Sequence, residues 1–169
     1  SQYSILQALP SPKELFAKAK ELGQEAIAIS DYGNLSGVWD CYKASKDTGV
    51  KFIPGCELYF TNDLADKEEK LRQVVLLAKN AEGYKNLLRL HRAGFDRHSI
   101  IMKKVVPVID WGLLKKYSEG LICLTACGNG IIGQLINSKR FDEAEETLQK
   151  LIDIFGQNLG AEIQAHNAI

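Results

Sequence analysis

Short apolar runs alternate along this chain with longer segments whose apolar residues recur at helical spacing. Runs without polar alternation predict buried strands, and periodicity with start and stop residues predicts helices. We expect strands at 26–29, 51–54, 55–60, 74–78, 121–125 and 160–164, and helices at 12–22, 35–48, 81–93, 110–117, 131–137 and 142–155. This order predicts an α/β fold with a mainly parallel sheet. The short intervals between strands favour an incomplete or distorted barrel over an open sheet.

The stretch from residue 26 to residue 34 contains the first candidate site. A buried strand is followed by Ser30, Asp31 and Asn34, whose oxygens stand at the strand's carboxyl end. Parallel α/β folds build their sites at that end, and right-handed connections bring the strand ends to one side. Residues 125–127 and 164–166 follow later strands and are expected to lie near Asp31. The alternative is that Asp31 and Asn34 only cap a turn and the next helix.

Capping residues and periodic faces support the helix assignments. Ser11, Pro12 and Glu14 form a capping-box start, and Asn80 and Asp110 are suited to cap later helices. Apolar side chains that share one helix face are Leu35, Val38, Trp39 and Tyr42 in the second helix, and Ala144, Leu148, Leu151, Ile152 and Phe155 in the last.

Composition narrows the class of protein. The 169 residues can form one domain. The formal net charge of zero argues against tight binding of nucleic acid by this piece alone. No apolar run reaches membrane-spanning length, and no signal peptide opens the chain. The cysteines form no Cys-x-x-Cys pair, which indicates reduced thiols and a cytoplasmic location. The abrupt ends at Ser1 and Ile169 suggest a piece of a longer protein.

A glycine motif follows one of the predicted strands. Gly128, Gly130 and Gly133 match the G-x-G-x-x-G spacing of dinucleotide-binding turns. The acidic residue expected to close a second strand is missing, because Asp153 falls inside a helix. We therefore favour a turn that needs glycine's backbone freedom, and keep a nucleotide-binding module at Gly128–Gly133 as an alternative.

The polar residues at the strand ends could instead form a metal site. Asp31, Glu57, Cys127 and His166 offer carboxylate, thiolate and imidazole ligands for zinc or another first-row metal. The other histidines are His91, expected on the buried side of a helix, and His98, expected in solvent. A catalytic metal needs three protein ligands in the right geometry, so ligand count alone disfavours an intact site.

Several motifs resemble the polymerase and histidinol phosphatase (PHP) domain of bacterial DNA polymerase III alpha subunits. They are Ser-x-Tyr-Ser-Ile-Leu at 1–6, Ser-Asp-Tyr-Gly-Asn at 30–34, Ile-Pro-Gly-Cys-Glu at 53–57, and the segments 76–87, 116–122 and 162–166. Their order and spacing hold over nearly the whole chain. The resemblance implies one PHP domain over 1–169, forming an incomplete distorted (βα)7 barrel whose last part lies beyond the chain. In complete members, histidines, acids and a cysteine hold up to three metal ions that support phosphoester hydrolysis.

Residue by residue, the resemblance implies a degenerate form of that metal cluster. Positions of family ligands fall on Gln7, Tyr32 and Gln73, while Glu57 and Cys127 keep ligand residue types. Asp31 is implied to support the site rather than to bind metal. An amide is a weak ligand, and a phenol with a pKa near 10 donates a proton more readily than it binds metal. We expect Tyr32 to fill the space of a metal and Glu57 and Cys127 to be vestiges.

The resemblance also implies the wider function. The parent would be a DNA-directed DNA polymerase that uses magnesium, in which this domain is metal-free and structural, with no catalytic residue of its own. The alternative is a residual phosphoesterase or 3′–5′ exonuclease that binds zinc or manganese. Implied partners are the other domains of the alpha subunit, a proofreading exonuclease subunit and, through the parent enzyme, DNA; no membrane contact is expected.

Overall fold

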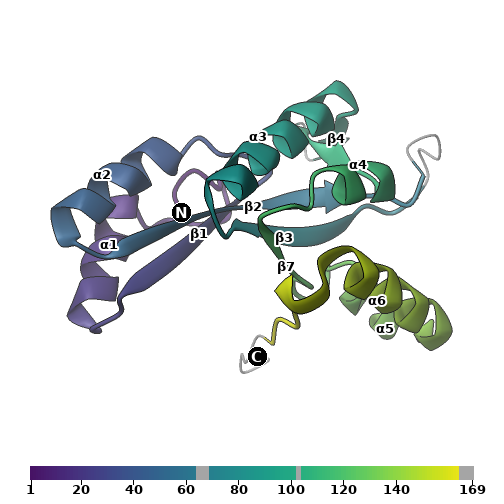
Figure 1. Ribbon diagram of the computed structural model, residues 1–169. Helices are drawn as coiled ribbons and strands as arrows, with labels where there is room; N and C mark the ends of the chain where they lie inside the picture. Colours follow the sequence, from purple (N-terminus) through teal and green to yellow (C-terminus); the bar gives the residue numbers. More distant parts are fainter. Residues whose placement is uncertain (64–68, 102–103, 164–169) are drawn as a thin grey trace.

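The computed structural model describes residues 1–63, 69–101 and 104–163, in which a mixed sheet carries helices along its length (Figure 1). The sheet order is β1 (Ala26–Tyr32), β2 (Lys51–Phe60), β3 (Arg72–Ala78), β7 (Leu121–Leu124) and β8 (Leu159–Gly160), and β6 (Val108–Ile109) also pairs with β2. The predicted α/β class is confirmed. Over the described residues the sheet has open edges at β1 and β8, so closure into a barrel stays a prediction.

One strand runs against the parallel pattern. The pairs β1–β2, β2–β6 and β7–β8 are parallel, whereas β3 is antiparallel to both β2 and β7. An antiparallel partner can follow directly from its neighbour without a crossover helix. The start of β3 therefore lies beside the end of β2, and Phe60 pairs with Arg72.

The described α-helices are α1 (Pro12–Glu21), α2 (Val38–Thr48), α3 (Ala81–Asp96), α4 (Trp111–Lys116), α5 (Gly133–Asn137) and α6 (Phe141–Phe155). Three of them, α1, α3 and α4, begin at the capping residues that the sequence predicts. Ser11 and Glu14 form the predicted capping box. Asn80 and Asp110 each accept a hydrogen bond from a backbone N–H in the first turn of their helix. These confirmed caps satisfy donors that would otherwise be orphaned at the helix ends.

Two hydrophobic clusters hold the layers together. The larger one joins strands β2, β3 and β7 to α3 and α6, and its fully buried members include Leu58, Leu76, Leu90 and Leu151. The smaller one joins α1 and α2 to β1, around Phe16, Cys41 and Val50. Each large aliphatic side chain buried in this way contributes about 1.5–3 kcal/mol to folding.

Three segments differ from the sequence prediction. Residues 51–60 form one strand rather than two, because Pro54 is accommodated opposite Ile29 in the parallel ladder. Part of the region expected to be irregular forms a hairpin of β4 (Ser99–Ile101) and β5 (Lys104–Val106). The last strand covers only Leu159–Gly160, and residues 164–169 lie outside the described residues.

The apolar faces of two helices are only partly used in these cores. On α2 the buried residues are Cys41 and Ala44, whereas Trp39 is 66% exposed and Tyr42 46% exposed. On α6 the predicted face buries Ala144, Leu151 and Phe155 but leaves Leu148 and Ile152 partly exposed. The exposed pair Trp39 and Tyr42 of α2 thus differs more from the expected buried face than the exposed residues of α6 do.

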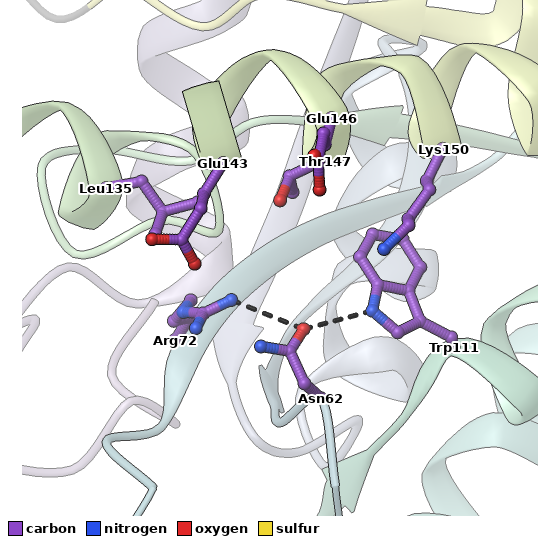
Figure 2. A pocket seen from close by; sticks show the side chains of 8 residues that line it. All are labelled: Asn62, Arg72, Trp111, Leu135, Glu143, Glu146, Thr147 and Lys150. Atoms are coloured by element: carbon purple, nitrogen blue, oxygen red, sulfur yellow. Dashed lines mark hydrogen bonds between the residues drawn. The ribbon is translucent and has the colours of Figure 1, made fainter. Parts of the chain in front are cut away.

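A polar pocket of about 290 Å³ separates α6 from the end of the sheet (Figure 2). Arg72 and Asn62 form its floor, and Lys150 of α6 lies 5.7 Å from the ring centroid of Trp111. Asn62 Oδ1 accepts hydrogen bonds from the indole Nε1 of Trp111 at 3.0 Å and from Arg72 at 3.4 Å. The pocket is therefore bounded by side chains that hydrogen-bond to one another.

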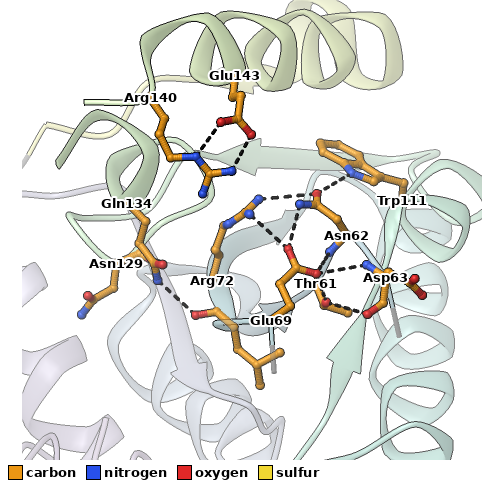
Figure 3. A network of polar contacts seen from close by, with 11 residues as sticks. Thr61, Asn62, Asp63, Glu69, Arg72, Trp111, Asn129, Gln134, Arg140 and Glu143 are labelled. Carbon is orange, nitrogen blue, oxygen red and sulfur yellow. Dashed lines mark hydrogen bonds and ion pairs between the residues drawn. The ribbon is translucent and has the colours of Figure 1, made fainter. Parts of the chain in front are cut away.

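The floor of that pocket belongs to a buried ionic network (Figure 3). Arg72 and Glu69 form an ion pair of 3.1 Å, with side-chain exposures of 7% and 15%. Glu69 also accepts hydrogen bonds from the hydroxyl of Thr61 and from the backbone nitrogens of Asn62 and Asp63. This network fixes the two ends of the β2–β3 connection against each other.

Candidate functional site

The candidate site is built on one face of the β1–β2–β3 sheet. Tyr32 of β1 lies directly opposite Glu57 of β2. Two residues further along β2, Tyr59 lies opposite Gln73 of β3. Alternate residues of a strand, and residues opposite each other in neighbouring strands, share one face. The sheet therefore places these four side chains together.

The antiparallel direction of β3 explains how Gln73 joins this group. Gln73 stands near the start of its strand, whereas Tyr32 and Glu57 stand toward the ends of theirs. Because β3 runs the opposite way, its start lies at the same end of the sheet. The sequence prediction of a mainly parallel sheet offered no such explanation for Gln73.

The loop after β7 adds Cys127 to the same place. Gln73 donates its backbone N–H to the carbonyl of Asn129 at 3.1 Å and accepts from the N–H of Ile131 at 2.9 Å. Cys127 also lies near enough to Tyr32 to contribute, after burial and Glu57, to the raised pKa of its phenol. The loop after β7 therefore lies beside the strand ends that carry Tyr32, Glu57 and Gln73.

The charges at this site are of one sign. Burial, followed by the charge of the nearby Glu162 carboxylate, raises the pKa of Glu57 to about 7. Burial, followed by the charge of Glu57, also raises the pKa of the Tyr32 phenol. At neutral pH Tyr32 is therefore a neutral phenol, and Glu57 is divided between its protonated and ionised forms.

Two members of the site were not predicted as site residues. Tyr59 could have been found from the period-2 alternation that puts it on the same face as Glu57. Glu162 follows β8, and its backbone N–H donates to the hydroxyl of Thr125 at 3.0 Å. Its place depends on the pairing of β8 with β7, which no local sequence pattern reveals.

Asp31 lies on the other face of β1 from Tyr32 and Glu57. Its carboxylate accepts hydrogen bonds from the hydroxyls of Ser1 at 2.8 Å and Ser4 at 2.7 Å, and the amino group of Ser1 lies 2.5 Å from it. The Ser4 hydroxyl also accepts the backbone N–H of Tyr32 at 3.1 Å. Asp31 therefore positions the strand end that carries Tyr32, which agrees with a supporting role.

The other predicted residues are more scattered. Gln7 is exposed in the turns before α1, and His98 is exposed after α3. His91 is half buried, burial lowers its pKa, and its buried Nε2 has no hydrogen-bond partner among the described residues. His166 lies outside the described residues.

A metal ion would need a denser set of ligands than this site offers. Over residues 1–63, 69–101 and 104–163, no group of three or more His, Cys, Asp or Glu side chains is arranged to hold one. Glu57, Glu162 and Cys127 are the available ligand types, and a phenol and two amides complete the predicted positions. This donor set does not fit a catalytic metal centre, which needs three strong ligands and an open position.

The glycine motif has a backbone explanation. A Cβ atom on Gly130 would stand 2.0 Å from the carbonyl oxygen of Thr125, and one on Gly133 would stand 2.5 Å from that of Cys127. The helix that follows, α5, has only five residues. These glycines allow a tight turn after β7, and the structure gives no support to a dinucleotide site there.

Comparison with known proteins agrees with this geometry. The family model described as "PHP domain" matches residues 1–166. The DNA polymerase III subunit alpha of Aquifex aeolicus is 39% identical over 99% of this chain, and that of Chlamydia muridarum is 40% identical over 99%. The chain spans about 15% of the length of the first of these relatives and 14% of the second.

The solved structures that resemble this chain are more distant than the polymerase subunits. An amidohydrolase from Chromobacterium violaceum matches 51% of this chain and 28% of its own, with 18% identity and a TM-score of 0.38, too low to inform the site. Within the part of the chain that the structure describes, none of the helices has the length and apolarity needed to cross a bilayer. The family match over nearly all residues decides the assignment: the chain belongs to the PHP domain family.

Proposed function

We propose that this chain is the PHP domain of a bacterial DNA polymerase III alpha subunit. The support is the match of almost the whole chain to relatives of that name at 39–40% identity. The parent protein would be a DNA-directed DNA polymerase whose magnesium-dependent site lies outside these residues. The other alpha-subunit domains and a proofreading exonuclease subunit are its proposed partners, DNA is reached through the parent enzyme, and the cytoplasm is its proposed location.

Within that enzyme we propose a metal-free, structural role and a sheet that continues into the family's barrel. The observation that carries the metal-free role is the placement of Tyr32 directly opposite Glu57. The resemblance assigns the Tyr32 position to a histidine ligand, and here it holds a phenol whose pKa is raised, so that it keeps its proton. Gln73, at another ligand position, is an amide that lies opposite Tyr59. Hydrolysis by an activated water needs a bound cation, and neither the Tyr32 phenol nor the Gln73 amide is a strong ligand for one.

Metal analysis of the full-length protein, purified without chelators, tests this role. We expect zinc and manganese well below one ion per PHP domain, and no release of nucleotides from single-stranded DNA. A matched double variant, Tyr32→His with Gln73→His, restores two imidazoles and should raise the zinc content. Stoichiometric metal in the unmodified protein, removed by Glu57→Gln, would overturn the proposal.

A residual metal-dependent phosphoesterase or 3′–5′ exonuclease is the second candidate. The observation in its favour is that Glu57, Cys127 and Glu162 all lie near enough to Tyr32 to raise the pKa of its phenol, although the described residues hold no group of three such ligands arranged for a metal. If it is correct, added manganese should produce hydrolysis of single-stranded DNA that Cys127→Ser abolishes. A polymerase-site variant must keep that hydrolysis, which separates it from activity elsewhere in the protein.

A further inference from the structure

A large trough lies between α2 and α3, away from the candidate site. Its volume is about 1040 Å³, and its lining includes Leu35, Phe52, Pro54, Ala78 and Ile122. Trp39 and Tyr42 of α2 form one wall, and Tyr84 of α3 contributes to the other. In Figure 1, α2 and α3 stand apart along the sheet, with β2 passing between them.

The order of elements explains why the trough exists. The chain goes from α2 through β2 directly to β3 and then to α3. Because β3 is antiparallel to β2, no crossover helix covers the sheet between α2 and α3. An α/β sheet normally has that face covered by helices. One helix position in the layer is therefore open.

The wall of the trough is made of exposed aromatic side chains. Trp39 and Tyr42 stack with their ring centroids 5.6 Å apart, although they are 66% and 46% exposed. Neither belongs to the hydrophobic clusters of the domain. Stacked aromatic side chains beside an apolar floor are typical of protein interfaces, where they provide much of the binding energy.

The rim of the trough is positively charged. The charged side chains that line it are Lys46, Lys51 and Lys79, and no acidic side chain lines it within the described part of the chain. Lys46 lies 5.3 Å from the ring centroid of Tyr42. Asp40 of the same helix is already paired with Lys43 at 2.7 Å. The chain as a whole carries no formal net charge, so this rim is a local feature.

We propose that the trough binds one amphipathic helix of a partner protein, with an apolar stripe flanked by acidic residues. A cylinder about 10 Å across encloses roughly 420 Å³ per helical turn, so the trough has room for about two turns fully enclosed, or for one face of a longer helix. The apolar floor receives the stripe, and the three lysines pair with its flanking carboxylates. This inference stands whether or not the parent protein is a polymerase.

Single-stranded nucleic acid is the competing occupant. Stacked aromatics and lysines also occur in nucleic-acid grooves. The largely aliphatic floor and the absence of arginine from the described lining favour a helix, because arginine commonly contacts phosphates and stacks on bases.

Fluorescence anisotropy of labelled probes with the full-length protein tests the proposal. The probes are a synthetic helix with a leucine stripe flanked by glutamates, the same stripe flanked by lysines, and oligothymidylate. We expect the acidic helix to bind. Replacing the rim (Lys46→Glu, Lys51→Glu, Lys79→Glu) should weaken it about tenfold and improve binding of the basic helix. Trp39→Ala should weaken both helices about tenfold or more.

A charge-matched control and a cross-link locate the binding. The control variant (Lys13→Glu, Lys20→Glu, Lys115→Glu) changes exposed lysines elsewhere and should bind the acidic helix as the unmodified protein does. A benzophenone on the leucine stripe should cross-link within residues 35–54 or 78–84. Three outcomes would overturn the proposal: oligothymidylate binding that depends on the rim, equal binding of both helices, or a trough closed to every probe by another segment of the full-length protein.

Discussion

Two buried glutamates of this domain have opposite pKa shifts. Burial opposes ionisation of Glu69, but hydrogen bonds from Thr61 and the backbone of Asp63 and Asn62, with the charge of Arg72, lower its pKa below the ordinary value. Burial, together with the charge of its neighbour Glu162, raises the pKa of Glu57 to about 7. An ionised glutamate thus stabilises the fold where hydrogen-bond donors surround it and destabilises the fold where other acids surround it. Glu69 has a structural role, and Glu57 belongs to the candidate site.

Removal of Arg72 should have the largest effect. Arg72→Leu removes the ion-pair partner of the half-buried Glu69, and we expect a loss of about 3–5 kcal/mol in the free energy of unfolding. Urea unfolding at neutral pH measures it. The control is Arg97→Leu, which removes a half-exposed partner 2.8 Å from Asp110 and should cost at most about 1 kcal/mol. Equal losses in both variants would mean that the network is no stronger than a surface pair.

Glu57→Gln should stabilise the protein, and only at high pH. The pKa of Glu57 is near 7 in the fold and near 4.5 in the unfolded chain, so ionisation begins to cost stability above pH 4.5 and the cost is complete above pH 7. A shift of that size corresponds to about 3 kcal/mol. Urea unfolding at about pH 8.5 should show this gain, and at about pH 4 the gain should vanish. A gain that does not depend on pH would contradict the account.

Glu69→Gln should have the opposite sign and a smaller size. A lowered pKa gives stability that is present above the ordinary value near 4.5 and is lost as the pH falls through the lowered one. We expect a loss of about 1–3 kcal/mol at neutral pH, because Arg72 and the donors around Glu69 lose a charged acceptor. The same unfolding series should show the loss shrinking in acid. A variant that is more stable than the unmodified protein at pH 7 would remove the contrast between the two glutamates.

Tyr59→Phe should have the smallest effect. Burial and the charge of Glu57 raise the pKa of Tyr59, and the side chain of Gln73 opposes them. Loss of this polar contact should cost about 0.5–1.5 kcal/mol in unfolding. Because a neutral phenol carries no charge that could act on Glu57, the pH dependence of the Glu57→Gln gain should be the same in a Tyr59→Phe background. A changed dependence would show that Tyr59 donates to Glu57 instead.

Features with local causes could be predicted from the sequence. The capping residues Ser11, Asn80 and Asp110 mark helix starts because their hydrogen bonds close within a few residues. The clustering of Tyr32, Glu57 and Cys127 followed from strand ends and from the family resemblance.

Features with long-range causes could not be predicted. The direction of β3 depends on pairing across the sheet, and it alone explains how Gln73 reaches Tyr59. Glu162 reaches the site through the pairing of β8 with β7. The apolar face with Trp39 looks like a core face in sequence, but its exposure follows from the missing helix between α2 and α3.

The metal-free role can be tested by a carboxyl NMR titration of Glu57, with and without equimolar zinc. We predict a midpoint near pH 7 that zinc does not move, because burial and the charge of Glu162 raise the pKa of Glu57 and the neighbouring Tyr32 keeps its proton. A midpoint near 4.5, or one that falls when zinc is added, would show that a cation belongs beside Glu57 and would contradict the metal-free role.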